Sequence, residues 1–337
     1  MAEPLLDVRN LSVHFPTEDG LVKAVDGVSF SIRQGETLGV VGESGSGKSV
    51  TFLTVMGLID RKTAKVEGEI LYKGKDLLKA TNDELRAVRG KSISMIFQDP
   101  MTSLHPFYKV GVQIVEAIRT HQAIDKKAAR AQAVEMLRRV GIPRPEERAA
   151  QFPHEFSGGM RQRAMIAMAL SLNPDLLIAD EPTTALDVTV QAQILDLIDR
   201  LKDEFSAAVV MITHDLGVVA EHCDDIQVMY AGKAVEFGTR DDVYYNARHP
   251  YTWGLLQSIT RMDQPKTDRL KPIRGLPPSL IFVPPGCSFH PRCPYVMDVC
   301  RVEVPPLTVQ DGRHANACHL QFAEKQRIFQ EEVLQHR

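Results

Sequence analysis

The chain has 337 residues, of which 44% are hydrophobic and 25% charged, and its formal net charge is −3 at pH 7. The length allows about two domains of ~150 residues each, and the composition is that of ordinary soluble globular proteins, which excludes wholly disordered and collagen-like chains. Basic and acidic residues nearly balance, so the net charge of the chain would not attract a polyanion such as nucleic acid. A nucleic-acid-binding protein of this kind would need a local basic patch, and none stands out in the sequence.

The amino end carries no sign of export or membrane insertion. Its first residues include Glu3 and Asp7, and no apolar run follows a charged start as it does in a signal peptide. No stretch approaches the roughly 18 consecutive apolar residues that span a bilayer. We therefore expect a cytoplasmic chain that reaches a membrane only through a partner.

Short apolar, β-branched segments alternate with longer helix-like stretches along the first 259 residues. Strands are predicted at 38–41, 93–97, 176–179 and 209–213. This alternation predicts an α/β fold around a mostly parallel sheet. Between about 106 and 172, apolar residues recur at helical spacing without a convincing strand, which predicts an α-helical insertion within the α/β domain.

The composition shifts after Trp253, because more than half of the twenty prolines lie between Pro250 and Pro306. Regular elements do not tolerate such a density of proline. We therefore expect a first domain over residues 1–259 and a loop-rich extension over 260–337, with a short helix from 323 to 335.

The strongest motif is a phosphate-binding loop, Gly42-Glu43-Ser44-Gly45-Ser46-Gly47-Lys48-Ser49. It follows the predicted strand 38–41 and opens the helix-like run 50–59, which is the context that the motif requires. Backbone N–H groups of such a loop surround phosphates, Lys48 would neutralise β/γ charge, and the Ser49 hydroxyl would ligate Mg²⁺. A Gly/Ser loop that matches by chance is the alternative, on the order of one in a hundred for a chain of this length.

Two further groups have the chemistry of ATP hydrolysis. The strand 176–179 ends in Asp180 and Glu181, of which the first could hold Mg²⁺ and the second could polarise an attacking water. Gln98 closes the strand 93–97, and its amide could bridge Mg²⁺ and that water. Taken alone, such a carboxylate pair is more often a solvated turn, and an edge glutamine is usually solvated.

Two more candidates lie at element ends. Ser157-Gly158-Gly159 opens the helix-like stretch 160–172 and could bind an anion, although an ordinary N-cap has the same sequence. His214 follows the strand 209–213 and could contact a γ-phosphate, although a lone histidine there is more often structural.

The order of these parts, with Ala185-Leu186-Asp187 between the carboxylates and His214, resembles the nucleotide-binding subunits of ATP-binding-cassette proteins over about residues 5–255. The resemblance implies a P-loop ATPase core with an amino-terminal antiparallel β part, and ATP and Mg²⁺ as cofactors. It also implies that Phe15 stacks on adenine, that Ser157, Gly158 and Gly159 reach ATP bound to a second subunit, and that Asp187 lies at the dimer seam. The signature departs from the family pattern, with Phe156 for Leu and Met160 for Gln.

The extension adds a second resemblance. The segments 248–256 and 285–294, followed by Cys300, are similar to the carboxyl-terminal extension of oligopeptide, dipeptide and nickel importer ATPases, and closest to the dipeptide type. This implies an ATP-hydrolysing subunit that lies at the cytoplasmic face of the inner membrane and energises the uptake of di- or oligopeptides. The implied partners are a second, often non-identical ATPase, two permeases and an extracytoplasmic binding protein.

Three other functions remain open at this point. Nickel or another small solute could be the cargo, because the extension is shared with nickel importers. A soluble cassette ATPase in DNA repair or translation would have the same ATP chemistry, but usually carries coiled-coil insertions or two cassettes. A metal- or redox-sensing module with a regulatory ATP site is the third.

Four of the five cysteines, Cys287, Cys293, Cys300 and Cys318, lie within 32 residues of the extension. Disulfides are disfavoured in a reducing cytoplasm, so a four-cysteine metal site is the better interpretation. Structural zinc usually uses closer pairs, whereas a cubane cluster tolerates separated thiolates and often has proline after a cysteine, as at Pro294. We hypothesise a [4Fe–4S] cluster, with zinc as the alternative, and expect Cys223 to be a buried structural thiol.

Overall fold

A computed structural model describes residues 3–99, 103–184, 186–258 and 273–334. The chain divides into two compact units. Unit 1 comprises the described residues within Arg33–Glu36 and Lys79–Met211, and unit 2 comprises those within Glu3–Ile32, Thr37–Leu78 and Ile212–Arg337.

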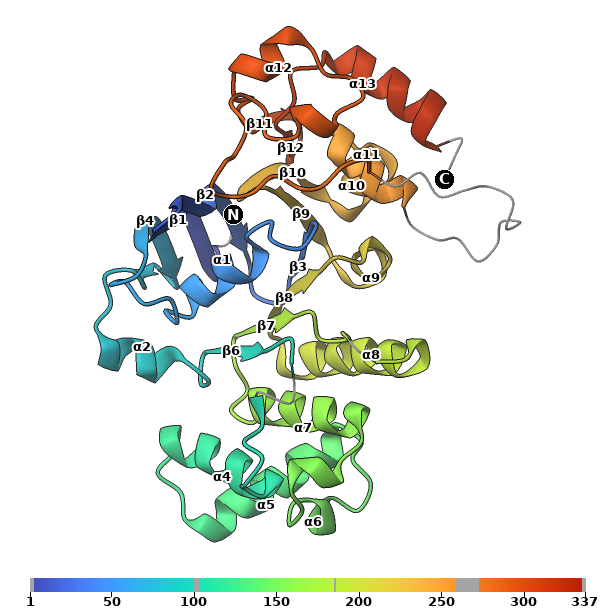
Figure 1. The fold of residues 1–337 in the computed structure, drawn as a ribbon. Helices are drawn as coiled ribbons and strands as arrows, with labels where there is room; N and C mark the ends of the chain where they lie inside the picture. The colour runs from blue at the N-terminus through green and yellow to red at the C-terminus, as the bar shows by residue number, and fades with distance from the viewer. Residues whose placement is uncertain (1–2, 100–102, 185, 259–272, 335–337) are drawn as a thin grey trace. The chain divides into compact units, whose positions relative to one another are not determined.

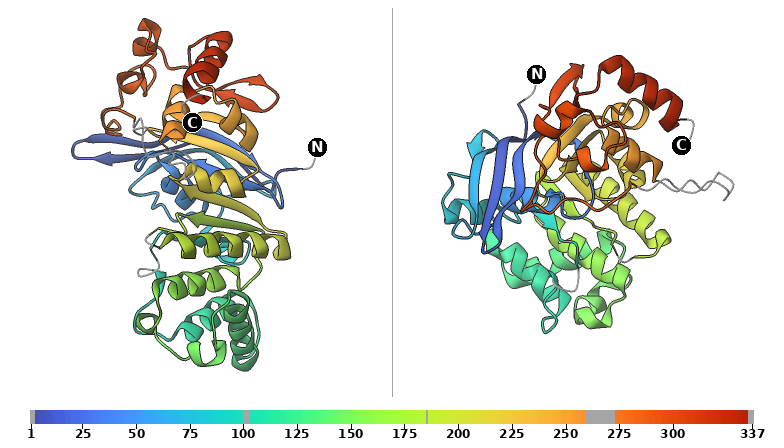
Figure 2. Two further views of the ribbon diagram at one scale, coloured as in Figure 1. Left: turned by 90° about the vertical axis from the view of Figure 1, so that its right-hand side faces the viewer. Right: turned by 45° about the horizontal axis from the view of Figure 1, so that its top comes forward.

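Unit 2 contains the expected antiparallel β part. Its strands stand in the order β2-β1-β4-β5, and β1 and β2 lie side by side in Figure 2. Leu6, Val8, Leu11 and Val13 are fully buried, so one face of β1 packs into the core. The bounds are Leu6–Thr17 for β1, Gly20–Ile32 for β2, Lys65–Tyr72 for β4 and Lys75–Asp76 for β5.

A second group of strands in unit 2 carries the phosphate-binding loop. Strand β3 (Thr37–Val41) runs parallel to β9 (Asp225–Tyr230), which pairs antiparallel with β10 (Lys233–Thr239). The extension adds β12 (His314–Asn316) to the edge of β10 and β11 (Thr308–Asp311) beyond it. Strands β3 and β9 are buried throughout, as expected for central strands.

The helices of unit 2 are labelled in Figure 1. They are α1 (Lys48–Val55), α9 (Leu216–His222), α10 (Arg240–Tyr245), α11 (Pro250–Gln257), α12 (Asp298–Val302) and α13 (Phe322–Ile328). Helix α1 ends before the predicted 59 because Gly57 takes a φ of 61°, a left-handed conformation that terminates helices. Helix α13 continues into the wider turn Phe329–Val333 and so confirms the described part of the predicted helix 323–335.

Unit 1 contains parallel strands and helices. Strand β6 (Ile93–Ile96) pairs parallel with β7 (Leu176–Asp180), and β8 (Ala208–Thr213), whose residues up to Met211 belong to this unit, follows β7 in the strand order. All three strands are buried throughout. With β3, they confirm the four predicted strands to within one residue at each end.

The helices of unit 1 include the predicted insertion. They are α2 (Asn82–Val88), α4 (Val110–His121), α5 (Lys126–Arg139), α6 (Pro145–Arg148), α7 (Gly158–Leu170) and α8 (Val188–Phe205). Helices α4 to α7 lie together in Figure 1, and no strand interrupts residues 106–172, all of which are described. The α-helical insertion is therefore confirmed.

The domain boundary and the absence of a membrane-spanning helix were also predicted from the sequence. The predicted domain boundary at 259/260 lies outside them, because 259–272 are not described. Within the described ranges, no helix is both long enough and apolar enough to cross a bilayer.

Candidate functional site

The loop between β3 and α1 has a shape that only glycine permits at two positions. Gly47 has a φ of 97°, and a Cβ there would lie 2.2 Å from the Ala24 carbonyl oxygen. A Cβ on Gly42 would lie equally close to the carbonyl oxygen of Met229, at 2.2 Å. The neighbouring backbone therefore presses against the outside of the loop and fixes its curvature.

Lys48 and Ser46 have the chemistry and position to meet phosphate. Lys48 is only 5% exposed, and its Nζ donates to the carbonyl oxygens of Gly42 at 2.6 Å and Glu43 at 3.1 Å. The Ser46 hydroxyl is buried and finds no hydrogen-bond partner among the described residues. Ser49 follows in the first turn of α1. A buried cation and an unsatisfied hydroxyl at a helix start fit a bound nucleoside triphosphate with its Mg²⁺.

Glu43 is in the loop, but its side chain faces the extension. Its carboxylate forms an ion pair with Arg292, and its backbone N–H donates to the Tyr251 hydroxyl at 2.8 Å. Glu43 is predicted to bind nucleotide, but in this structure both its carboxylate and its backbone N–H bind residues outside the loop. Arg292 and Tyr251 are functional candidates that the sequence did not single out, since nothing local links them to a loop more than 200 residues away.

Phe15 pairs across the sheet with a residue that lines a cavity at the loop. It is the cross-strand neighbour of Val22, so the two side chains share a face of the sheet. Val22 lines a cavity of about 430 Å³ together with Ser44, Gly45 and Ser46 of the loop. Adenine stacking by Phe15 stays a prediction.

In unit 1, the structure brings two predicted hydrolytic residues together. Glu181 follows the last residue of β7, and its Oε2 accepts hydrogen bonds from Gln98 Nε2 at 3.0 Å and Thr184 Oγ1 at 2.9 Å. Asp180, the last residue of β7, is buried. Thr184 was not predicted; the signal that could have found it is a hydroxyl three residues after the carboxylate, in a turn closed by its N–H on the Glu181 carbonyl.

The predicted signature residues cap helices on unit 1. The Ser157 hydroxyl accepts from the N–H of Met160 at 3.3 Å at the start of α7, and the Asp187 carboxylate caps α8 through Val190 at 3.0 Å. A Cβ on Gly159 would lie 3.0 Å from Val190, so the start of α7 comes close to that of α8. Ser157, Gly158 and Asp187 are exposed, and their action on a second subunit stays a prediction.

The remaining predicted residue, His214, is exposed directly after β8. His214 and the phosphate-binding loop belong to unit 2, whereas Gln98, Asp180 and Glu181 belong to unit 1. The structure places each set within its own unit, and the role of these residues in binding and hydrolysing one Mg²⁺-bound nucleotide stays a prediction.

The cysteines of the extension lie near one another. Burial raises the pKa of Cys293 to about 12 and of Cys318 to about 11, and the pKa of Cys287 is raised for the same reason. The other thiols, Cys300 among them, contribute to the raised pKa of Cys293, so they lie within electrostatic reach.

The predicted four-cysteine metal site is not confirmed. In the described ranges, no group of three or more Cys, His, Asp or Glu side chains is arranged to hold a metal ion. Burial raises the pKa of Cys287, Cys293 and Cys318, so a metal, which binds thiolates, would have to displace their protons. Cys223 is 3% exposed, which confirms that it is a buried thiol.

Comparison with known proteins covers both parts of the chain. Residues 25–184 match the family model described as ABC transporter, and residues 235–300 match that of the oligopeptide/dipeptide transporter C-terminal region. The dipeptide transport ATP-binding protein DppD of Bacillus subtilis is 54% identical over 320 residues, covering 95% of each chain. The oligopeptide transport ATP-binding protein OppD of Haemophilus influenzae is 51% identical over 322 residues, covering 96% of this chain and 98% of that protein.

A solved structure is similar in fold. The dimeric structure of MJ0796, a bacterial ABC transporter cassette, has a TM-score of 0.63 and 28% sequence identity, and the match covers 70% of this chain and 98% of that one. The predicted α/β cassette with its helical insertion is thereby confirmed.

Proposed function

This chain belongs to the ATP-binding-cassette family, in the group of oligopeptide and dipeptide transport ATP-binding proteins, and on that premise we propose that it hydrolyses ATP to energise the uptake of di- or oligopeptides. The observation that carries the hydrolytic part is the Glu181 carboxylate, which Gln98 and Thr184 hold at the end of β7. The peptide part is supported by the match of the extension to peptide transporters.

The roles of the loop residues follow from their chemistry. Lys48, released from its two carbonyl partners, stabilises charge on the β- and γ-phosphates. Ser49, Asp180 and Gln98 are the residues that would hold Mg²⁺, which neutralises phosphate charge when bound. Phe15 would stack on the adenine.

Glu181 is the proposed general base. Two hydrogen bonds to one oxygen hold its carboxylate in place, and it would take the proton of the attacking water. His214, at the end of β8, would hold the γ-phosphate.

The partners and the location are proposed from family membership. Ser157, Gly158, Gly159 and Asp187 would complete the ATP site of a second ATPase subunit, which we take to be a non-identical paralogue. Two permeases and an extracytoplasmic peptide-binding protein would complete the importer. The chain would then lie at the cytoplasmic face of the inner membrane, with no nucleic-acid partner.

The four cysteines are proposed as a metal site of the extension, with a [4Fe–4S] cluster before zinc. Their shared neighbourhood supports this, and their arrangement would have to tighten for ligation. Anaerobically purified protein should contain iron and acid-labile sulfide and absorb near ~400 nm. Stoichiometric zinc without sulfide, or protein without metal, would reject the cluster.

Co-purification tests the importer assignment. The tagged chain is recovered from detergent-solubilised membranes, and its partners are identified by mass spectrometry. Two polytopic permeases and a second cassette subunit are the expected partners. Recovery of only soluble nucleic-acid or ribosomal factors would overturn the transport assignment, while leaving the ATP site intact.

Nickel as cargo is tested by adding peptide or Ni²⁺ to the reconstituted complex and measuring which one stimulates hydrolysis.

A further inference from the structure

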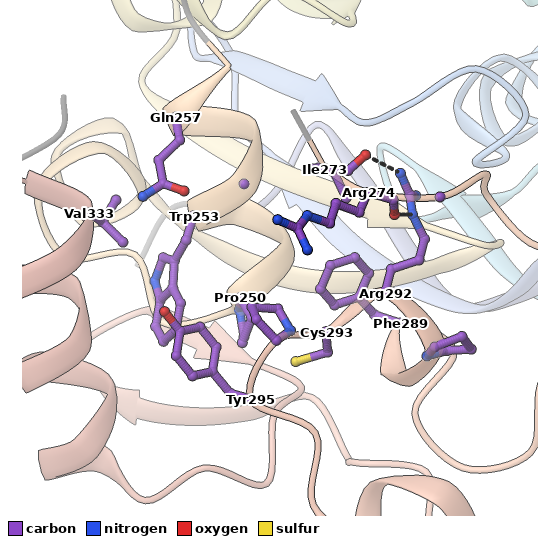
Figure 3. Close-up of a pocket in the computed structure, with 14 residues that line it drawn as sticks. Pro250, Trp253, Gln257, Ile273, Arg274, Phe289, Arg292, Cys293, Tyr295 and Val333 are labelled. Carbon is purple, nitrogen blue, oxygen red and sulfur yellow. Dashed lines mark hydrogen bonds between the residues drawn. The ribbon is translucent and has the colours of Figure 1, made fainter. Parts of the chain in front are cut away.

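One arginine of the extension reaches the phosphate-binding loop. Arg292 ends the 3₁₀ turn His290–Arg292, directly before Cys293, and its side chain is only 5% exposed. It borders a cavity of about 970 Å³ whose walls include Phe289, Tyr295 and Trp253 (Figure 3). Its guanidinium points away from solvent toward Glu43 of the loop.

Every N–H of the Arg292 guanidinium has an acceptor. Nη1 and Nη2 bind the two carboxylate oxygens of Glu43 at 2.5 and 2.9 Å, a bidentate pair. Nη1 also donates to the Tyr230 hydroxyl at 3.3 Å, while Nε and Nη2 donate to the carbonyl oxygens of Arg274 and Ile273 at 3.0 and 3.5 Å (Figure 3). Because the planar fork is used completely, a lysine could not reproduce these contacts.

An aromatic cluster supports the same loop residue. The Tyr251 hydroxyl accepts the backbone N–H of Glu43 at 2.8 Å. The Tyr251 ring lies 4.6 Å from that of Tyr230 and 5.4 Å from that of Phe289, measured between centroids. Glu43 is therefore held through both its side chain and its backbone by residues packed around the extension.

Fixing Glu43 also fixes the part of the loop that holds Lys48. The Glu43 carbonyl oxygen accepts from Lys48 Nζ and from the Ser46 N–H, at 3.1 and 3.2 Å. The ion pair has a second effect, because it neutralises a carboxylate on the loop that receives the phosphates. Without Arg292, that carboxylate would repel the phosphates.

We propose that Arg292 is a positioning residue for nucleotide binding, through which the extension shapes the phosphate-binding loop and cancels the charge of Glu43. This rests on the proposed ATPase function. Arg292 acts through Glu43 and does not itself touch the nucleotide. Since the effect is on the loop before any bond breaks, it changes the KM for ATP more than kcat.

The test uses the purified full-length chain and four variants: Arg292→Gln, Arg292→Lys, Glu43→Gln and the double variant Glu43→Gln/Arg292→Gln. Steady-state hydrolysis gives KM and kcat, and a fluorescent ATP analogue gives Kd. Arg301→Gln, which changes an exposed arginine of the same extension, is the matched control. Thermal unfolding shows whether each variant folds. If the Arg292 variants do not fold, Glu43→Gln still tests the ion pair, because glutamine has nearly the same shape as glutamate.

The expected order separates charge from packing. Arg292→Gln should raise KM about 10-fold because it exposes the Glu43 charge, and Glu43→Gln should raise KM only about 3-fold. The double variant should bind ATP better than Arg292→Gln alone, since the unpaired carboxylate is gone. Arg292→Lys should fall between wild type and Arg292→Gln, and kcat should change less than about 2-fold in all of them.

Two outcomes overturn the inference: an unchanged KM in folded Arg292→Gln, or a double variant weaker than either single variant. Failure of the proposed function is a separate result. It would appear as wild-type hydrolysis that Glu181→Gln does not reduce, whereas normal Glu181-dependent hydrolysis with an unaffected Arg292→Gln rejects only the positioning role.

Discussion

Glu181 has a backbone conformation that its residue type rarely takes. Its φ is 45°, in the left-handed region, where a non-glycine residue costs roughly 1–3 kcal/mol. The conformation turns the chain directly after Asp180 and places the carboxylate on Gln98 and Thr184. Strain of this kind at the end of a buried strand is consistent with a site that is kept for chemistry.

The first prediction concerns this carboxylate. Glu181→Gln keeps a side chain of the same shape but cannot accept the proton of the attacking water. We expect ATP binding to be retained and turnover to fall by roughly 10²-fold or more, the range for a lost general base. Phosphate release and equilibrium nucleotide binding, measured on the same preparation, check both parts. The exposed Glu221, replaced in the same way, is the control; equal turnover in the two variants would reject the assignment.

His249 is a buried histidine that folding keeps neutral. It is 1% exposed at the start of α11, where its Nδ1 accepts the N–H of Tyr251 at 3.1 Å. Burial, and to a lesser extent the charge of Lys325, lowers its pKa from 6.5 to about 3. Between those two pH values the unfolded chain takes up a proton at this position and the folded chain does not.

The second prediction follows from that difference. Stability from His249 is fully present above pH 6.5 and is lost as the pH falls toward 3, at most by about 1.4 kcal/mol per pH unit. His249→Asn keeps an acceptor for the helix cap and removes the titrating group, so its stability should depend less on pH in this range. Urea unfolding monitored by the single Trp253, which is buried in the same unit, measures this. Identical pH slopes for the two proteins would contradict the prediction.

At the scale of elements, the phosphate-binding loop depends on close backbone contact. Gly45 and Gly47 both have positive φ, 77° and 97°, but only Gly47 faces neighbouring backbone, whereas a Cβ on Gly45 would meet nothing within 4 Å. The two glycines are therefore a matched pair that separates backbone conformation from steric contact.

The third prediction uses this pair. Gly45→Ala should lower the free energy of unfolding by about 1–2 kcal/mol, the cost of a left-handed alanine. Gly47→Ala should cost at least ~2 kcal/mol more, because the loop must move away from the Ala24 carbonyl. Urea titrations of both variants check the difference, and equal losses would mean that the loop yields without cost.

Most elements could be predicted from local pattern. The buried strands β3, β6, β7 and β8 are continuous apolar runs, which the sequence shows directly. The β11–β12 hairpin was not predicted in the extension, because β11 is exposed throughout and β12 has only three residues. Its pairing with β10 is a tertiary contact without a local signal.

The candidate site likewise has residues that the sequence predicts and residues that it does not. The loop 42–49 and the strand-end residues Asp180 and Glu181 follow from spacing, and the contact between Gln98 and Glu181 matches the expected chemistry. The partners of Glu43 could not be predicted, since Arg292 is 249 positions away and only folding brings the two together.

At the scale of the whole molecule, the described extension belongs to the same compact unit as the phosphate-binding loop. The β12–β10 pairing and the Arg292–Glu43 ion pair join them. The buried Glu236 of β10 strengthens this junction, because it accepts from His314 of β12 at 2.8 Å and from the N–H of His249 at 3.2 Å. The extension is thus placed to influence nucleotide binding.

The central claim is that hydrolysis through Glu181 energises peptide uptake. The most direct measurement is uptake of a radiolabelled dipeptide by cells in which Glu181→Gln replaces the wild-type chain. Dipeptide uptake should fall to background, while nickel uptake stays at the wild-type level. Undiminished dipeptide uptake, or loss of nickel uptake alone, would contradict the account.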